Sequence, residues 1–434
     1  MTRWLAAVVL VLVGAVGAPG TLLAQSGAGA GEHTADELVA RALRDNPELA
    51  ALRAEVEAAQ GRLRQAGLRP NPMVELNGQK ALGPDHNLGI GVTLPLDLNG
   101  RKEGRVGVAE GELGMRHARL VEGERRLRAE VRARVGDLLA ARRDVEVTDR
   151  LLEVNRDALR LVGERAARGA VPPLDESLLL VEVNRLEAQR RVLDSRVEVL
   201  TLALKALAAL PPDAPLALRG DLASVAAAPA RDWAVARVDE RPDVVMARAE
   251  AATARARIAR EEAEGRWDAS VSLGYQRQEF GYSLSGIAAN GTLQPIMDVF
   301  HYFGGGVTIT LPVRNRNQGN VAAARAEARA AERRLDLARL MARQEVDAAF
   351  AQHAASRGAL DVYGSGVRDV ARRNVEVVRQ AYALGRGTLL DVITEQRRYI
   401  EAEMGYTEAL RRVFAAAVDV ERAVGARPSA GGDR

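Results

Sequence analysis

The sequence predicts an α+β fold in which short β-strands lead directly into very long helices. A short alternating segment, 88–96, passes through a glycine turn into an uninterrupted helix-forming segment that reaches about residue 167, and the same arrangement returns over 303–384. Alternation of apolar with small or polar residues predicts a strand with one apolar face. A helix of about 65 residues extends roughly 100 Å, so its partners must be other long helices.

The composition favours long packed helices over large globular cores. The hydrophobic share of the 434 residues comes mainly from Ala, Val and Leu, and aromatic residues make up only 3%. The 61 Lys and Arg residues nearly balance the 58 Asp and Glu residues and are interleaved with them, so we expect solvated helix faces and no nucleic-acid partner. The absence of cysteine excludes disulfides and a lipid-modified N-terminal cysteine.

The first residues predict a signal peptide over 1–24. Arg3 supplies a positive charge, residues 4–16 form an apolar segment, and a plausible cleavage site follows Ala24. A retained membrane anchor is the alternative, although the apolar segment is short for a bilayer. Residues 25–33 are expected to be flexible. An exported chain without another apolar helix of membrane length is either soluble outside the cytoplasm or inserts as β-strands.

The first structural repeat is predicted over 34–215. Its opening helix begins at Thr34, which forms a capping-box pattern with Glu37, and breaks at Asn46. After the prolines of 69–72, a β-hairpin is expected over 73–96, with strands 73–80 and 88–96.

A long helix from Arg101, a tight tip at 168–173 and a returning helix complete the first repeat. Apolar residues recur every seven positions on both helices, which predicts an antiparallel, left-handed coiled coil. These positions are Val131, Leu138, Val145, Leu152, Leu159 and Ala166 on the first helix, and Leu179, Leu186, Leu193, Leu200 and Leu207 on the second.

The second structural repeat is predicted over 233–425, after a connector at 216–232 and before a polar tail at 426–434. It contains a helix to about Gly265, a β-hairpin over 268–313, a long helix to about Leu384, a tip and a last helix. The hairpin strands are expected to flank a long turn from Gln278 to His301. Gly169 and Gly385 are 216 positions apart, as are Asp175 and Asp391, so we interpret the chain as an internal duplication.

Four one-sided strands per chain are too few to close a barrel, and lipid tolerates no open sheet edge. If the strands lie in a membrane, several copies must share one barrel, and ~10 residues per tilted strand suits an outer membrane. The alternative, a secreted structural coiled-coil protein of the envelope with small sheets, leaves the one-sided apolar faces unexplained.

Three features together resemble the outer membrane factor family, the TolC-like channels. They are the duplicated arrangement, the segment Val92-Thr-Leu-Pro-Leu96 leading into Gly100-Arg101, and the paired glycine-containing tips. The segment 66–72 and the junction Leu98-Asn-Gly-Arg-Lys102 are similar to the heavy-metal branch, the CzcC/CusC-like proteins.

The resemblance implies a membrane α+β protein with the outer membrane efflux protein fold. It implies a homotrimer whose 12-stranded β-barrel, four strands per chain, continues into a long periplasmic α-helical barrel. It also implies a passive exit duct for heavy-metal cations in the cell outer membrane, which works with a periplasmic adaptor and an inner-membrane proton-driven pump of the resistance-nodulation-division (RND) type. The alternatives are a multidrug or general export duct, a structural envelope protein and, last, an enzyme.

No catalytic, cofactor or metal constellation is predicted. The sequence has no phosphate-binding loop or nucleophile elbow, and its five histidines are scattered. The run Gly304-Gly-Gly306 lies inside a predicted strand, where close backbone approach in a barrel wall explains it.

The resemblance places a pore constriction at the tips. Asp391 matches a family aspartate that rings the closed end, where three symmetric carboxylates would attract cations and raise one another's pKa. Alternatively, the negative charge of Asp391 only interacts favourably with the positive N-terminal end of its helix dipole, as that of Asp175 does. Where some members have a second aspartate, this chain has Thr394 with Glu395 beside it. Tyr382 is expected either to hydrogen-bond Asp175 or to pack as an ordinary helix residue.

The tips are also the expected surface for the adaptor. Glycine permits the chain reversals, and the neighbouring apolar residues provide a surface that a helical hairpin of the adaptor could bury. The predicted docking residues are Arg168, Gly169, Val171, Gly385, Gly387, Leu389 and Leu390.

Overall fold

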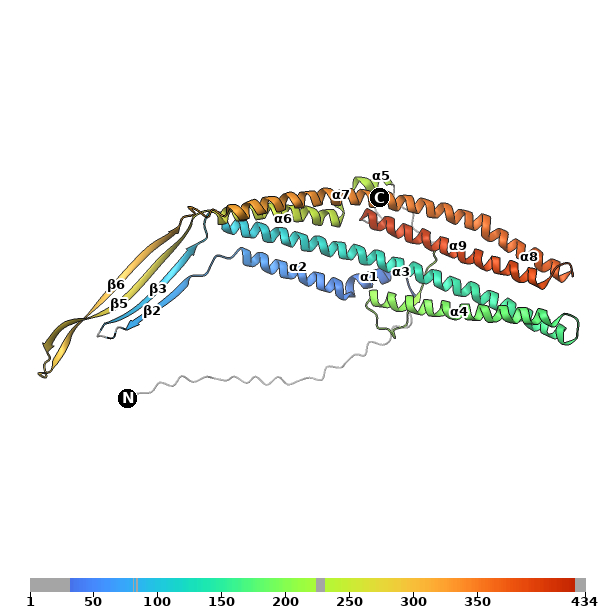
Figure 1. The fold of residues 1–434 in the computed structure, drawn as a ribbon, viewed down its shortest axis with the longest axis horizontal. Helices are drawn as coiled ribbons and strands as arrows, with labels where there is room; N and C mark the ends of the chain where they lie inside the picture. The colour runs from blue at the N-terminus through green and yellow to red at the C-terminus, as the bar shows by residue number, and fades with distance from the viewer. Residues whose placement is uncertain (1–31, 81, 83–84, 224–230, 426–434) are drawn as a thin grey trace, which may run out of the picture.

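The computed structural model describes residues 32–80, 82, 85–223 and 231–425. The molecule is long and thin, with a β-sheet at one end and helices running from it to two tips at the other (Figure 1). In the described part, no helix is both long and apolar enough to cross a lipid bilayer. The predicted signal peptide, most of the segment 25–33 and the tail 426–434 lie outside the described residues.

Two short helices open the first half: α1 (Ala35–Asp45) and α2 (Pro47–Ala66). The predicted capping box is confirmed, because the Thr34 side chain accepts a hydrogen bond from the Glu37 amide at 3.2 Å and the Glu37 carboxylate accepts one from the Thr34 amide at 3.0 Å. Asn46 ends α1 and caps α2 by accepting a hydrogen bond from the Glu48 amide at 2.9 Å. The proline after Asn46 then starts the second helix, since proline suits a first helical position.

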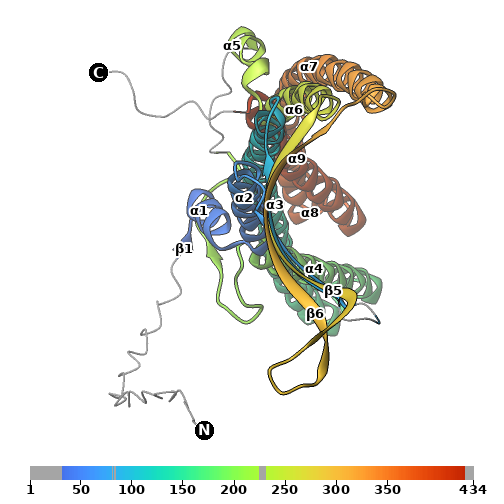
Figure 2. The same cartoon turned by 90° about the vertical axis from the view of Figure 1, so that its left-hand side faces the viewer.

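Four antiparallel strands form the sheet, in the order β2-β3-β5-β6. They are β2 (Met73–Lys80), β3 (His86–Leu96), β5 (Asp268–Ile287) and β6 (Leu293–Thr310), and the sheet is curved (Figure 2). The first predicted hairpin is confirmed. The predicted long turn over 278–301 is wrong, because β5 and β6 stay paired as far as Ile287 and Leu293, with one irregularity between Gly281 and Ser285.

The true turn of the second hairpin is short. Ala288 donates a backbone hydrogen bond to Thr292 at 2.9 Å, and Gly291 has a φ of +80°, which glycine adopts without strain. Gly281, Ser285 and Gly286 look like turn residues in the sequence, yet the structure pairs each of them with a residue of β6, on either side of the irregularity.

One face of the sheet is apolar and uncovered. Register places Val92 beside Val74 and Leu273, so apolar residues of adjacent strands share this face. Leu76, Leu273 and Phe303 are 74%, 67% and 82% exposed. The opposite face carries small and polar residues, which border a hollow of about 680 Å³ lined in part by Asn77, Gly91, Ser272, Gln276 and Gly306.

The first helical hairpin consists of α3 (Arg101–Ala167) and α4 (Pro173–Leu207). The predicted seven-residue stripes face inward: Leu138 and Leu186 are fully buried, and Leu152 and Leu179 are nearly so. The two helices therefore pack along the predicted stripes, as an antiparallel pair (Figure 1).

The second half begins with α5 (Arg231–Ala236), the turn η1 (Val238–Glu240) and α6 (Pro242–Glu264). The prediction of one continuous long helix to about Leu384 is wrong in one respect. The helices α7 (Gln318–Asp361) and α8 (Asp369–Ala383) are separated by a π-helical segment, η2 (Val362–Arg368). The last helix is α9 (Leu389–Val424).

The π-helical segment coincides with close packing against α9. A Cβ on Gly405 would lie 2.5 Å from the Tyr363 ring, so this glycine makes room for the ring. The Ser365 hydroxyl donates to the Asp361 carbonyl at 2.9 Å. Widened turns of this kind accommodate a local misfit in a helix.

A two-stranded parallel sheet forms from segments predicted to be flexible or connecting. It pairs β1 (Glu32–His33) with β4 (Ala217–Leu218), and the Arg219 amide extends it with a hydrogen bond to the His33 carbonyl at 2.9 Å. The pairing ties the start of α1 to the connector that follows α4.

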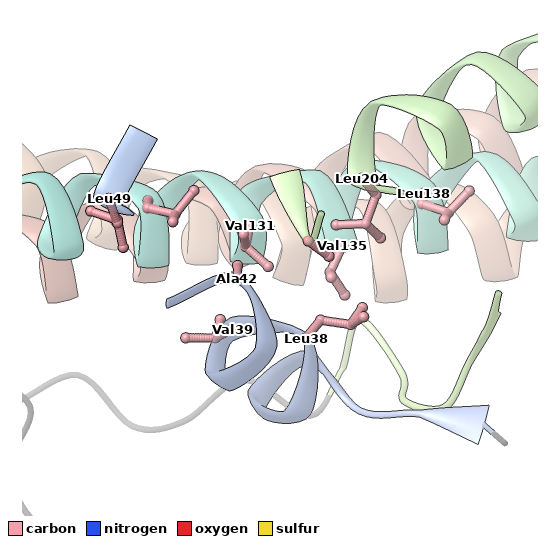
Figure 3. Close-up of a cluster of buried hydrophobic side chains, with 10 residues drawn as sticks. Leu38, Val39, Ala42, Leu49, Val131, Val135, Leu138 and Leu204 are labelled. Carbon is pink, nitrogen blue, oxygen red and sulfur yellow. The ribbon is translucent and has the colours of Figure 1, made fainter. Parts of the chain in front are cut away.

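The largest apolar cluster lies where α1 packs on α3 and the end of α4 (Figure 3). Leu38, Val131 and Leu204 are fully buried there. The long helices form an extended layer, which we call the shaft. The short helix α1 thus adds thickness to the shaft at mid-molecule.

Near the sheet, α3 and α6 approach unusually closely. Glycines recur on one face of α3 at positions 104, 107, 111 and 114. A Cβ on Gly104 would lie 2.8 Å from the Arg260 Cα, whereas one on Gly114 would make only ordinary contact with Ala249 at 3.9 Å. Small residues let helix backbones approach, and here they allow α3 and α6 to pack closely beside the sheet.

Candidate functional site

The two tips that the sequence singles out lie together at the end opposite the sheet (Figure 1). Both helices end with the same pair of hydrogen bonds: Gly169 and Ala170 donate to Ala166 and Arg165, and Gly385 and Arg386 donate to Tyr382 and Ala381, all at 2.9–3.0 Å. This is the Schellman arrangement, in which the residue after the helix adopts the left-handed conformation. Gly169 and Gly385 have φ values of +69° and +71°.

Only two of the three predicted tip glycines are required by backbone conformation. Gly387 has no positive φ, and a Cβ there would make ordinary contacts of 3.6 Å or more with Tyr382 and Ala381. The prediction that glycine permits the reversal therefore holds for Gly169 and Gly385 but not for Gly387.

Asp391 caps the last helix. Its carboxylate accepts hydrogen bonds from the Thr388 amide at 3.0 Å and the Thr388 hydroxyl at 2.7 Å, and its own amide donates back to that hydroxyl. The Thr388 hydroxyl and amide hold the pKa of Asp391 below its usual value. Asp391 therefore has a capping role within its own chain, which is the role that the helix-terminus alternative gives it.

Tyr382 and Asp175 lie near each other but are not hydrogen-bonded in the described structure. Burial raises the pKa of Tyr382, and the negative charge of Asp175 raises it further. The Tyr382 ring packs on an apolar cluster of Val162, Leu179 and Ile393. The expected hydrogen bond is therefore wrong for this conformation, and the alternative of ordinary packing describes Tyr382.

Glu395 points away from the tip. Its carboxylate accepts a 2.5 Å hydrogen bond from Arg398, and its side chain is only 15% exposed. Both residues line a groove against α8. The Thr394 hydroxyl donates to the Leu390 carbonyl at 2.8 Å, so the polar groups of Thr394 and Glu395 both have partners on their own helix.

The predicted docking residues divide by exposure. Arg168, Gly169 and Gly385 are exposed, and Leu390 is 57% exposed. Val171 and Gly387 are half-buried. Leu389 is only 6% exposed and packs with Val162, so its assignment to the docking surface is wrong: the first turn of α9 uses it as core.

Two exposed leucines at the tips were missed from the sequence. Leu174 and Leu384 are 65% and 73% exposed. Periodicity alone cannot tell which apolar residues a neighbouring helix covers, so the sequence does not mark these two leucines as exposed.

A buried carboxylate links the two helical hairpins just behind the tips. Glu182 on α4 is 1% exposed and accepts hydrogen bonds from Arg185 at 2.6 Å and, across to α9, from Arg397 at 2.8 Å. Burial alone would raise the pKa of Glu182, but the two arginines outweigh it and lower that pKa. No sequence signal marks Glu182, since it stands among many alternating charges.

Asp144 on α3 is a second partly buried carboxylate in the shaft, and burial raises its pKa to about 6. The folded chain therefore holds a proton there more tightly than the unfolded chain, so stability falls as pH rises from about 3.8 to about 6. We expect Asp144→Asn to raise the unfolding free energy by about 2 kcal/mol above that range, after allowance for solvent screening, and to change it little below. Chemical denaturation at several pH values measures this, and an equal gain at every pH would contradict it.

No group of three His, Asp or Glu side chains is placed to hold a metal ion among the residues that the structure describes. The described part thus offers tips, a groove and a hollow sheet face as candidate sites.

Comparison with known proteins gives consistent matches over nearly the whole chain. The model of a family described as outer membrane efflux protein matches residues 38–210 and 236–426. The cobalt-zinc-cadmium resistance protein CzcC of Cupriavidus metallidurans is 24% identical over 396 residues, which cover 91% of each chain.

Solved structures share the fold. Crystal structures of CusC superpose with a TM-score of 0.74 at 15% identity, over 91% of this chain and 92% of that one. The outer membrane protein VceC of Vibrio cholerae superposes with a TM-score of 0.71 at 19% identity, over 90% of this chain and 96% of that one.

Proposed function

The chain belongs to the outer membrane efflux protein family, and from this premise we propose that it is the outer-membrane component of a tripartite RND-type efflux system. In this proposal it is a passive, non-enzymatic duct. Heavy-metal cations enter it from an inner-membrane pump through a periplasmic adaptor. The sheet lies in the outer membrane, and the helices extend into the periplasm.

The exposed apolar face of the sheet carries this proposal. In a water-soluble setting the exposure of Leu76, Leu273 and Phe303 together would be costly, and contiguous apolar surface of this kind marks a partner or a membrane. Hydrocarbon against that face, and water against the small and polar residues opposite, satisfies both faces.

Oligomerisation follows from the sheet edges. Within the described part of the chain, β2 and β6 each have one strand neighbour, so the two edges of the sheet are unpaired there. We propose that three copies join edge to edge into one 12-stranded barrel, because lipid does not tolerate unpaired strand edges. The matching tips and their equivalent glycines, Gly169 and Gly385, support the proposal that the chain is an internal duplication.

A matched pair of lysine substitutions tests the membrane assignment. Leu273→Lys places a charge on the apolar face, and Ser272→Lys places one on the opposite face of the same strand. We expect the first to cost about 2–4 kcal/mol and to reduce heat-resistant trimers in the outer-membrane fraction, and the second to be tolerated. Equal tolerance of both, or recovery of the mature protein as a detergent-free soluble monomer, would overturn the proposal.

The heavy-metal substrate is supported by the match to a cobalt-zinc-cadmium resistance protein. Deletion in the native host is expected to sensitise cells to divalent metal ions. Unchanged metal tolerance together with new sensitivity to drugs would instead identify a general export duct.

We propose that Asp391 attracts cations at the closed end of the trimer. Three copies of an ionised carboxylate near one axis would form a ring of negative charge, and the Thr388 hydrogen bonds, which lower the pKa of each Asp391, oppose the increase that mutual repulsion causes. We expect Asp391→Asn to weaken block of single-channel conductance by hexaamminecobalt at least tenfold, because the ring charge is lost. Asp157→Asn on the shaft is the control, and equal block in the parent and Asp391→Asn would remove Asp391 from the constriction.

We also propose that the exposed tips dock the adaptor. Leu390 and Leu174 offer apolar surface beside the glycine reversals. Gly385→Trp is expected to abolish cross-linking to the adaptor while trimers persist, and cross-linking at the parent level would argue against docking there.

A further inference from the structure

A cleft separate from the tips runs between α3, α8 and α9. Its volume is about 450 Å³, within the range of small-molecule sites. Three helix faces converge on it. Arg143 and Arg150 come from α3, and Gln396 and Tyr399 come from α9. The arginine stripe at 368, 372 and 379 runs from the π-helical segment into α8.

Positive charge dominates the cleft. Five arginines and two glutamates line it. The Glu403 carboxylate forms ion pairs with two of the arginines, at 3.5 Å from Arg143 and 3.4 Å from Arg368. Among the described residues, Arg150 and Arg379 have no carboxylate within ion-pair distance. Facing like charges raise the free energy of the empty cleft, and an anion between them would lower it.

The floor of the cleft supplies apolar and polar recognition. Tyr399 donates a hydrogen bond to Glu403 at 3.0 Å and presents its ring to the cleft, beside Val147 and Leu151. Gln396 is only 5% exposed, and its side-chain oxygen has no hydrogen-bond partner among the residues that the structure describes. Buried polar atoms are nearly always paired, so an unpaired one in a cleft points to a missing partner.

Two of the five arginines, Arg143 and Arg368, are held in place by packing over one aromatic ring. The guanidinium groups of Arg143 and Arg368 lie 5.4 and 4.7 Å from the centre of the Tyr406 ring. A Cβ on Gly364 of the π-helical segment would lie 3.6 Å from the same ring, so the widened turn fits over it. The irregular helix thereby sets where the arginine stripe begins.

We propose that this cleft binds a small organic anion that carries acidic groups and a hydrogen-bond donor on an apolar body. Arginines would receive the acidic groups, Gln396 the donor, and Tyr399 with the valine and leucine side chains the apolar body. The sheet lies at the opposite end of the molecule (Figure 1), so the ligand comes from solution and not from membrane lipid. The binding does not depend on export, and so it stands or falls separately from the proposed duct.

Sulfosalicylate is a suitable probe, because it combines a sulfonate, a carboxylate and a hydroxyl group on one ring and partitions poorly into lipid. Calorimetric titration of the full-length protein in nanodiscs, with empty nanodiscs subtracted, is expected to show saturable binding that weakens with salt. The double variant Arg150→Gln, Arg379→Gln should weaken it at least tenfold. These two arginines are chosen because neither forms an ion pair among the described residues, so replacing them leaves no carboxylate without its partner.

The control changes the same net charge elsewhere. Arg62→Gln, Arg329→Gln replaces two exposed arginines outside the cleft and should bind within twofold of the parent. Salicylamide, a neutral relative of the probe, should not bind saturably. The proposal is overturned if the parent does not bind sulfosalicylate, if the cleft variant binds as the parent does, if the control loses as much as the cleft variant, or if the neutral compound binds as well as the probe.

Discussion

Replacing Arg241 with alanine is expected to lower the unfolding free energy by about 3–5 kcal/mol, because it removes a buried cation and leaves its partners unpaired. Arg241 is 1% exposed and joins three helices. Its guanidinium donates to the Ala342 carbonyl of α7 at 3.3 Å, to the Ala423 carbonyl of α9 at 3.0 Å and to the Asp243 carboxylate of α6 at 2.7 Å. A 2.6 Å hydrogen bond to Glu345 completes the set.

Arg237→Ala is the matched control. Arg237 is 39% exposed and pairs with Glu240 on the surface, so its loss should cost less than about 1 kcal/mol. Denaturant unfolding in detergent, followed by far-UV circular dichroism, measures both. Similar losses for the two variants would mean that the buried arginine does not hold the three helices together.

Gly111→Ala is expected to cost about 3 kcal/mol through overpacking, although alanine is the better helix former. The added Cβ would lie 2.9 Å from the Thr253 Cβ and 3.0 Å from its Cα, distances that force α3 and α6 apart. Thr253 cannot turn away freely, because it is 2% exposed and its hydroxyl donates to the Ala249 carbonyl at 2.7 Å.

Gly114→Ala, one turn along the same face, separates crowding from helix propensity. Its Cβ would make only ordinary contact with Ala249, so the variant should gain up to about 1 kcal/mol. Opposite signs for the two variants are expected in the same unfolding assay. A gain for both would show that α3 and α6 are not in close contact at Gly111.

Local patterns were enough to predict most helices and strands. The Thr34 and Glu37 side chains, the proline after Asn46 and the seven-residue stripes each act within a few turns of chain. The strands of β2 and β3 were predictable because alternation over 73–96 is clean and the hairpin is short.

The second β-hairpin and the long helix that follows it were harder to predict from the sequence, for a physical reason. The glycines and serines of 281–286 favour turns locally, but pairing with the opposite strand over 293–300 outweighs that preference. The π-helical segment coincides with the fit of Tyr363 against Gly405, a contact between residues far apart in the chain.

At the candidate site the sequence indicated the tips, the reversing glycines and the position of Asp391 near a helix N-terminus, but not which side chains would be buried. Leu389 and Leu390 are neighbours of the same type, yet one faces the apolar cluster and the other faces out. Glu182 and the arginine cleft were unpredicted because each is assembled from separate helices.

What the sequence determined by itself is everything set by short-range periodicity and backbone preference: long helices, one-sided strands, two left-handed glycine reversals and the order in which they follow. What only the tertiary structure decided is which faces meet. The α3–α6 approach, the buried Arg241 and Glu182, and the convergence of arginines on one cleft depend on contacts between distant segments. Those contacts depend on the free energy of packing whole helices against one another. A short segment of sequence does not determine that free energy, because the partner residues lie elsewhere in the chain.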